Sequence, residues 1–563
     1  MSPVQLRTFH VRWSNLPQLD KPLQPLDVWY SAGYVQDEWR PRGNLTVTGG
    51  FRFDVSQFKN TAYANPAADA LSFRDETGAA VRYTTGSMPD TKVLWSPRLG
   101  LNWDVNSDQR MQVRGGTGVF SGRPAYVWIS NQIGNTGVLI GERLVDGPTT
   151  AFPFNPNPDT YKLPATGAGA SSYALNVTDP DFKFPQVWRN NIAVDYKLPL
   201  GIVSTTEYLF AKDVNGIYYI NANLPAAQST FSGVDNRPRW TGAACAAAGQ
   251  IGGCLNRINN DPGNQVTVNY VLKNGNEGKS WNFAETLTKN TRFGLSLRGA
   301  YSYGESESLV DPESTAATSF SRVAHHGDPN NAGVALSMWS PGHRAFALAT
   351  LSRQYFNFGS TTVSMFWEVK SNTLSASPRF SYVFAGDMNS DSINGNDLIY
   401  IPRNTSEMNF VPLTVGTRVF SPEEQAAAFE TYIQQDAYLK NHRGEYAERN
   451  GARFPMVNRV DLSILQDLFH NVGGQRNAFQ LRFDFFNFGN LLNDSWGVGK
   501  RPIAAINTNA QVSLLSFVGV DAQGRPTYRM ATANNELVTK SFQTSASTGD
   551  VYQYMISLRY SFN

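Results

Sequence analysis

The stretch from Leu45 to Val55 reads LTVTGGFRFDV, and its apolar residues fall on alternate positions. Its odd-numbered positions carry Leu, Val, Gly, Phe, Phe and Val, whereas its even-numbered positions carry Thr, Thr, Gly, Arg and Asp. Successive side chains of a β-strand point to opposite faces, so this order gives one apolar face and one polar face. The stretch therefore predicts a strand with an apolar environment on one side and a polar environment on the other.

The same alternation recurs along the chain and predicts a series of strands. We place them near residues 27–40, 43–56, 94–106, 109–121, 183–198, 201–213, 278–289, 291–305, 340–354, 357–370, 457–469, 476–488 and 552–562. Within successive pairs the predicted connections are a few residues long. Between pairs they are very long, near residues 57–93, 122–182, 214–277, 306–339, 371–456 and 489–551.

This regular exchange of short and long connections indicates the fold class. If the strands run up and down, all short turns lie at one end and all long loops at the other. Tight periplasmic turns and large extracellular loops are typical of outer-membrane barrels, whereas a soluble sandwich has no reason to separate its loops in this way. We therefore expect an all-β protein, an antiparallel transmembrane β-barrel of which this chain supplies about 13 strands.

Composition agrees with this expectation. Of the 563 residues, 12% are aromatic and only 17% are charged, against about a quarter in ordinary soluble proteins. The formal net charge is +2, so the sequence predicts no nucleic-acid partner. No run of about 20 apolar residues predicts a transmembrane helix. The chain has neither a nucleophile motif nor a phosphate-binding loop after a strand, so we do not expect an enzyme.

Five segments, in order, resemble the barrel of TonB-dependent outer-membrane receptors, and more narrowly the Oar-like group. They are WYSAGYVQDEWRPRGNLTVTGGFRFD at residues 29–54, SPRLGL at 96–101, GDMNSDSINGNDLIYIP at 386–402, RNGARFP at 449–455 and LRFDFFN at 481–487. The resemblance covers residues 27–563 and implies a place in the outer membrane of a Gram-negative bacterium. It also implies substrate uptake or translocation, with an unknown extracellular ligand and outer-membrane lipid as partners.

Such receptors resemble one another in a 22-stranded barrel that is filled by an N-terminal plug with a TonB box. By parity, the predicted strands correspond to the last 13, so we interpret the chain as a C-terminal fragment without the plug through which the TonB complex would act. Residues 1–26 would then be a partial strand or loop of an incomplete barrel. The final strand alternates up to Phe562 and resembles the signal read by the barrel-assembly machinery, although Asn563 follows it.

Two other functions stay open at this point. One is a passive outer-membrane porin or adhesin barrel without energy coupling. The other is a secreted soluble β-protein that binds glycans.

One segment has the oxygen spacing of a calcium loop. Its candidate ligands are Asp387, Asn389, Asp391, Asn396 and Asp397, because a hard cation prefers six to eight oxygen ligands. Ser392 stands where such loops usually have Gly, and Leu398 where they have Glu. A turn in which Asx side chains bind their own backbone is the alternative, which we favour.

The remaining candidates lie in the long connections. Cys245 and Cys254 predict a disulfide that closes a small loop in an oxidising compartment, and two unpaired thiols are the alternative. Ser421, Pro422 and Glu424 predict the start of a helix over residues 422–440. His325 and His326 predict a solvated loop rather than a metal site. A group of loop aromatics is a candidate for substrate contact or for internal packing, namely Tyr126, Trp128, Phe152, Phe154 and Tyr161.

Overall fold

The computed structural model describes residues 6–241, 257–261, 263–356, 359–373, 376–472, 475–506, 510–545 and 547–562. The predicted disulfide partners Cys245 and Cys254 lie outside these ranges, so their pairing stays a prediction.

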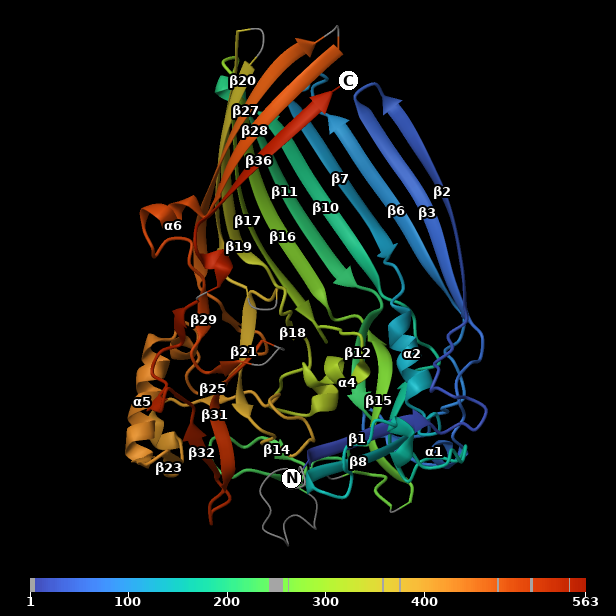
Figure 1. Ribbon diagram of the computed structural model, residues 1–563. Coiled ribbons are helices and arrows are strands. Elements are labelled where there is room, and N and C mark those ends of the chain that lie inside the picture. The colour runs from blue at the N-terminus through green and yellow to red at the C-terminus, as the bar shows by residue number, and fades with distance from the viewer. Residues whose placement is uncertain are drawn as a thin grey trace.

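One large antiparallel sheet dominates the chain (Figure 1). Of its 14 strands, β18 lies off the main path, which leaves 13 neighbours paired in chain order. Along the path they are β2 (Val28–Arg42), β3 (Leu45–Phe58), β6 (Lys92–Asp104), β7 (Met111–Ser121), β10 (Gln186–Lys197), β11 (Ile202–Asp213), β16 (Lys279–Asn290), β17 (Leu295–Ser308), β19 (Gly342–Tyr355), β20 (Gly359–Ser371), β27 (Met456–Val472), β28 (Gln475–Phe486) and β36 (Gln553–Phe562). Each predicted strand overlaps one of them, with ends that differ by a few residues, and the described pairings leave β2 and β36 at the two ends of the path.

The two faces of this sheet differ as the alternation predicts. Phe51 and Phe53 of β3 share a face with Trp95 of β6, and the rings of Phe51 and Trp95 stack at 5.3 Å. These three side chains are exposed, which suits contact with lipid. On the other face Arg52 and Asp54 form an ion pair with an N–O distance of 2.7 Å. The sheet thus has one apolar and one polar surface.

Because the strand order follows the chain and neighbours are antiparallel, the short and long connections separate to opposite ends (Figure 1). We call these the turn end and the loop end. The turns after β2, β6, β10, β16, β19 and β27 lie at the turn end, together with the C-terminal end of β36. The predicted separation of connections is therefore present in the fold.

The long connections are residues 59–91, 122–185, 214–278, 309–341, 372–455 and 487–552, and we call them together the loop body. They are not structureless. One sheet pairs β12 (Gly216–Asn221), β15 (Gln265–Gly275) and β9 (Ser172–Thr178), and another pairs β26 (Ala452–Arg453), β21 (Arg379–Ala385), β31 (Gln511–Val520), β30 (Ala505–Ile506) and β32 (Pro526–Met530). Two pairings, β15 with β9 and β21 with β31, are parallel and join connections that are far apart in sequence.

Shorter elements complete the loop body. The helices are α1 (Pro66–Asp69), α2 (Tyr126–Gly134), α4 (Ala316–Ser321), α5 (Pro422–Gln435) and α6 (Phe488–Leu492). The strands are β4 (Phe73–Arg74), β5 (Ala80–Val81), β8 (Ile140–Thr149), β13 (Ser229–Thr230), β14 (Pro238–Arg239), β18 (Ala335–Leu336), β22 (Tyr400–Ile401), β23 (Leu413–Val415), β24 (Arg418–Phe420), β25 (Glu445–Tyr446), β29 (Lys500–Pro502), β33 (Thr532–Ala533), β34 (Glu536–Leu537) and β35 (Phe542–Thr544). Among the described helices, none is long and apolar enough to cross a membrane.

The hydrophobic core of the protein lies in the loop body rather than in the large sheet. Its largest cluster contains Phe380, Phe384, Phe429, Phe454 and Val512, all buried. These residues come from the connection between β20 and β27 and from the one between β28 and β36. Burial of these aromatic side chains stabilises the loop body.

Two predictions about individual segments can be compared directly with the fold. The strand β1 (Leu6–Ser14) pairs with β8 of the loop body, so the described part of residues 1–26 adds no strand to the large sheet. The predicted helix start is confirmed, because Glu424 N–H donates to Ser421 Oγ and Ser421 N–H donates to Glu424 Oε2. The helix ends at Gln435, five residues before the predicted end.

Candidate ligand-binding site in the loop body

Arg237 is the junction at which several long connections meet. Its side chain is 0% exposed and forms ion pairs with Asp235 at 2.9 Å and Asp397 at 3.4 Å. It also donates to the carbonyl oxygen of Leu398 at 2.7 Å. A buried charge is tolerated only when it is paired and hydrogen-bonded, and here Asp235 together with Asp397 and Leu398 meets both requirements. Arg237 therefore ties the connection after β11 to the one after β20.

Aromatic rings enclose the guanidinium of Arg237. Its carbon lies 5.1 Å from the ring centroid of Phe384 and 5.3 Å from that of Tyr446. The ring of Tyr446 also stacks on His326, with centroids 4.3 Å apart and an interplanar angle of 7°. Cation–π contacts strengthen when they are removed from water. The stack thus brings His326, from the connection after β17, to the same junction.

His325 forms a second buried ion pair beside this stack. Its Nε2 lies 3.0 Å from Asp391 Oδ2, and its Nδ1 lies 2.9 Å from the carbonyl oxygen of Gly327. A doubly protonated ring satisfies both contacts, because each ring nitrogen then donates a hydrogen. The expectation that His325 lies in a solvated loop was wrong, since the residue is buried and fixes two connections to each other.

Burial and neighbouring charges shift the pKa values in this region. Burial raises the pKa of Asp387 to about 8, with a further rise from the charges of Asp391 and Asp397. Burial also raises the pKa of Asp397, to about 6, although the charge of Arg237 opposes the rise. For His325, burial opposes protonation, but the hydrogen bond and charge of Asp391 raise its pKa overall. Burial and the charge of Arg237 lower the pKa of His326. Three of these four groups therefore hold protons more strongly than free side chains.

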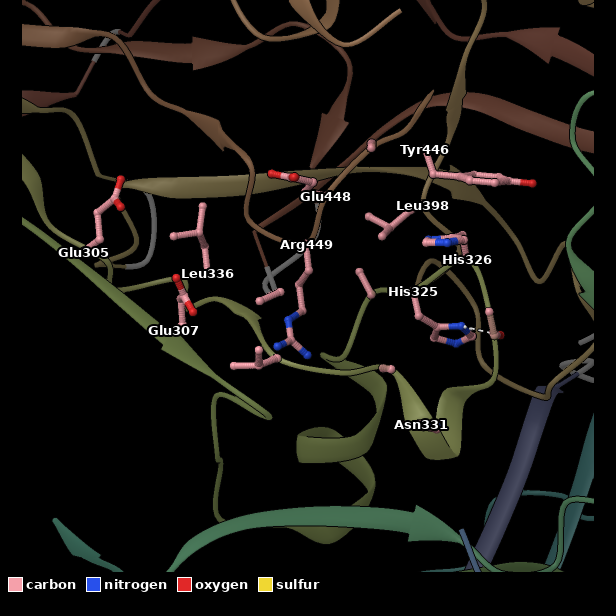
Figure 2. A pocket seen from close by; sticks show the side chains of 16 residues that line it. Glu305, Glu307, His325, His326, Asn331, Leu336, Leu398, Tyr446, Glu448 and Arg449 are labelled. Carbon is pink, nitrogen blue, oxygen red and sulfur yellow. Dashed lines mark hydrogen bonds between the residues drawn. The ribbon is translucent and has the colours of Figure 1, made fainter. Parts of the chain in front are cut away.

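A cavity of about 580 Å³ opens next to this junction (Figure 2). One side is formed by Glu305 and Glu307 of β17, and the other by His326 and Tyr446. Its volume is within the range of pockets that hold small ligands. The cavity has carboxylates at one side and an imidazole at the other, and aliphatic residues such as Leu336 and Leu398 also line it, so it offers both polar and apolar contacts.

Arg449 lies between these two sides in Figure 2. Its buried guanidinium donates to the carbonyl oxygens of Leu309 at 2.8 Å, Gly333 at 3.4 Å, and Ser308. No carboxylate lies within ion-pair distance of Arg449 in the part of the chain that the structure describes. The side chain therefore fastens the connection after β17 to the segment that follows β25.

The predicted calcium-loop residues come together, but with partners of their own. Asp387 accepts backbone N–H groups of Asp391 and Ser392 at 3.2 and 3.0 Å, as the favoured Asx turn predicts. The turn is largely buried, however, rather than at the surface. Across the described residues no three His, Cys, Asp or Glu side chains are arranged to hold a metal ion. A calcium ion therefore stays a prediction here, since its binding would require these contacts to rearrange.

Most of the candidate loop aromatics serve packing. Tyr126 lies edge-on to Phe184, and Trp128 donates from its indole to the carbonyl oxygen of Glu313. Phe152 stacks on Phe9 at 4.1 Å, and Tyr161 lies edge-on to that pair. Of the five, Phe154 alone is fully open, with 93% of its surface exposed. Direct contact with a large ligand is therefore geometrically open for Phe154.

Sequence reasoning missed the residues that organise this site. Arg237 and Asp235 stand two apart in a connection without a recognisable motif, and Arg449 was noted only as part of a resemblance. Two signals were available: the adjacent pair His325 and His326, which was interpreted as solvated, and the candidate calcium loop, which contains the two partners Asp391 and Asp397. The assembled site offers charged groups, hydrogen bonds and a cavity that can accommodate a ligand.

The chain is similar to a mutant of the ferric enterobactin receptor PfeA of Pseudomonas aeruginosa, with 10% identity, a TM-score of 0.35, and coverage of 96% of this chain and 54% of that chain. The outer membrane transporter YddB of Escherichia coli is 7% identical, with a TM-score of 0.36 and coverage of 96% of this chain and 55% of that chain. The copper transporter OprC is 8% identical, with a TM-score of 0.37 and coverage of 96% of this chain and 50% of that chain.

The chain thus spans about half the length of these structures. A search of curated proteins by sequence gave no match. Residues 16–508 match the family model described as the outer membrane beta barrel domain. The chain therefore belongs to the outer membrane beta barrel domain family, and it lies in the outer membrane of a Gram-negative bacterium.

Proposed function

We propose that this chain is the C-terminal barrel part of a TonB-dependent receptor that takes up or translocates a ligand. The observation that carries the proposal is the loop body, which is folded around its own core at one end of the sheet and contains a cavity with charged and aliphatic lining residues. A passive pore needs no such structure above its strands. A receptor that must select a ligand before transport does need it.

In this proposal the loop end faces the exterior and the turn end faces the periplasm. The edges of β2 and β36 pair with further strands of a 22-stranded barrel that precede the present chain. Unpaired N–H and C=O groups at a strand edge are very costly in lipid, so neither edge is stable there without a partner. The Oar-like group is the subgroup that the sequence motifs favour.

Transport would follow from ligand capture in the loop body. Bound ligand would be released into the barrel when the TonB complex displaces the plug. The partners are then outer-membrane lipid, the TonB complex through the plug, and the barrel-assembly machinery through β36. Each step is a binding or conformational step, and none requires bond chemistry from this chain.

A passive porin or adhesin barrel is the main alternative. The family assignment puts the chain in the outer membrane, which disfavours a secreted soluble glycan-binding protein. Reading the genomic sequence upstream of Met1 separates the two membrane alternatives. We expect a signal peptide, a TonB box and a plug of about 100–150 residues in the same reading frame. An unrelated gene directly upstream would refute energy coupling and leave the passive barrel.

A further inference from the structure

The charged side chain of Glu285, in β16, lies on the apolar face of the large sheet. Directly opposed residues of neighbouring antiparallel strands share a face, and so do alternate residues along one strand. The face of Trp95 can therefore be followed across the sheet to β16, through Leu101, Gly115, Ile192, Tyr208 and Phe283. Glu285 stands two positions after Phe283 and so belongs to the same face, the one that suits contact with lipid.

Glu285 also lies at the middle of its strand. β16 has Lys279 at the loop end and Asn290 at the turn end, and Glu285 is six residues from the first and five from the second. A transmembrane strand spans the hydrocarbon with about 9–11 residues. Phe283 and Leu287, which precede and follow Glu285 on the same face, are exposed apolar side chains. The carboxylate is therefore placed at the depth of the hydrocarbon core and not at the membrane surface.

Two hydroxyl groups hold the carboxylate on this face. Ser204 Oγ donates to Glu285 Oε1 at 2.6 Å, and Thr206 Oγ1 donates to Glu285 Oε2 at 2.5 Å. Both donors belong to β11, and Thr206 stands directly opposite Glu285. These contacts fix the side chain but leave its charge uncompensated, because no Lys, Arg or His lies within ion-pair distance of Glu285 in the described ranges of the chain.

Such a charge is costly in lipid unless something pairs with it. Ionisable side chains at membrane depth usually face the interior of a protein and mark a functional contact. A carboxylate has about four acceptor positions, and the two hydroxyl groups use two of them. Glu285 is half-buried, so part of its surface stays open on the lipid-facing side. A positively charged donor matches what remains, namely a negative charge with free acceptor positions in apolar surroundings.

A second copy of this chain is a poor match for the same surface. In a symmetric pair the same patch of both copies meets at the interface, so the two Glu285 side chains would face each other. Like charges placed together across an interface are strongly unfavourable. The occupant that fits is therefore a different protein.

We propose that the lipid-facing surface around Glu285 binds a membrane-embedded segment of a partner protein that presents a lysine or arginine side chain at this depth. The basic side chain pairs with the free acceptor positions of Glu285. Tyr208, Phe283 and Leu287 supply the apolar contacts around the ion pair. The inference depends on the place of the chain in the outer membrane, and it depends neither on energy coupling nor on the cavity in the loop body.

Energy transfer from tryptophan to a labelled peptide tests the proposal on the full chain folded in detergent micelles. The probe is a peptide of about 20 leucine and alanine residues with one central lysine and a dansyl group, and its neutral counterpart has norleucine at the centre. Trp281, on the same strand and face as Glu285, is a natural donor. We expect the lysine peptide to associate about tenfold or more tightly, as for a hydrogen bond between charged groups. Equal association of the two peptides would overturn the proposal.

Three variants make the test specific to this carboxylate. Glu285→Gln should remove the preference for the lysine peptide, and Glu285→Lys should transfer it to a peptide with a central glutamate. Glu207→Gln is the matched control, because Glu207 neighbours Thr206 at the same depth but stands opposite Ala284, on the other face of the sheet. This control should keep the preference of the unchanged chain.

Two other results would contradict a basic partner. If Glu285→Gln lowered the melting temperature but kept the preference for lysine, the role of Glu285 would be structural. Sedimentation in the same micelles checks self-association. Dimers of the chain that disappear in Glu285→Gln would make a second copy the occupant, against the proposal.

Discussion

Removal of the charge at Arg237 is the most direct test of how the loop body is held together. In Arg237→Met an unbranched apolar side chain fills similar space, but Asp235 and Asp397 keep their buried positions without a counter-charge. Loss of one partner of a buried ion pair costs about 3–5 kcal/mol. Asp397 can take up a proton, since its pKa already lies near 6, so we expect a value toward the lower end of this range.

Hydrogen exchange at backbone amides measures this loss where it occurs. Phe384 N–H donates to the carbonyl oxygen of Asp397, and Leu398 N–H donates to that of His325. A destabilisation of about 3 kcal/mol accelerates exchange of these two amides by about 100-fold, since about 1.4 kcal/mol corresponds to a factor of ten. The variant Arg418→Met is a matched control, because Arg418 is half-exposed and its ion pair with Glu536 should contribute about 1 kcal/mol or less.

A compensating variant separates charge from packing. When Asp235→Asn and Asp397→Asn are added to Arg237→Met, no buried charge remains unpaired, and protection should largely return. If Arg237→Met alone changed the exchange of these amides by less than about fivefold, the junction would not be stabilising the loop body. If the triple variant exchanged as fast as the single one, the loss would come from packing.

Three further predictions concern neighbouring features. The folded-state pKa values of Asp387, Asp397 and His325 all lie above the ordinary values of these groups. Their contribution to the free energy of unfolding is therefore complete below those ordinary values and is lost as pH rises through about 6–8. The loop body should melt at a higher temperature at pH 5 than at pH 8.5, and the reverse order would refute the assigned protonation. Ser421→Ala should destabilise the first turn of α5 by about 1 kcal/mol, measured by exchange of its amides, whereas Ser421→Asp should be nearly neutral. Addition of Ca²⁺ should leave the melting temperature unchanged, because Arg237 and His325 already form ion pairs with carboxylates of the Asp-rich turn. A rise in melting temperature that is reversed by a chelator, and that is absent in Asp391→Asn, would instead establish a calcium site.

The strands of the large sheet were predictable because their signal is local. In Leu45–Val55 apolar and polar side chains alternate every two residues, because successive side chains point in turn to the face that meets lipid and to the opposite face. The helix α5 was predictable for a similar reason, since Ser421 and Glu424 satisfy each other's backbone within one turn. In both cases the residues that decide the structure are close together in the chain.

The loop body was not predictable, because its contacts are long-range. Arg237 meets Asp397 across 160 positions, and His325 meets Asp391 across 66. The parallel pairing of β21 with β31 joins residue 381 to residue 511. No periodicity within either segment reports such a pairing. A single sequence therefore shows where the long connections are, but not that they fold together.

This difference bears on the proposed receptor function. A ligand site built from unconnected loops would have to order them on binding, at a cost of about 1–2 kcal/mol for each residue fixed. Here Arg237, His325 and Arg449 already join the connections after β11, β17 and β20, so the cavity beside them exists before any ligand arrives. Ligand binding then does not have to offset the entropy cost of folding the loops, so differences in contact free energy between ligands determine which one binds. These contacts include Asp397, whose pKa burial raises to about 6, and His325, whose pKa Asp391 raises despite the burial of the ring; external pH should therefore change how firmly the cavity is held, and with it the affinity for a ligand.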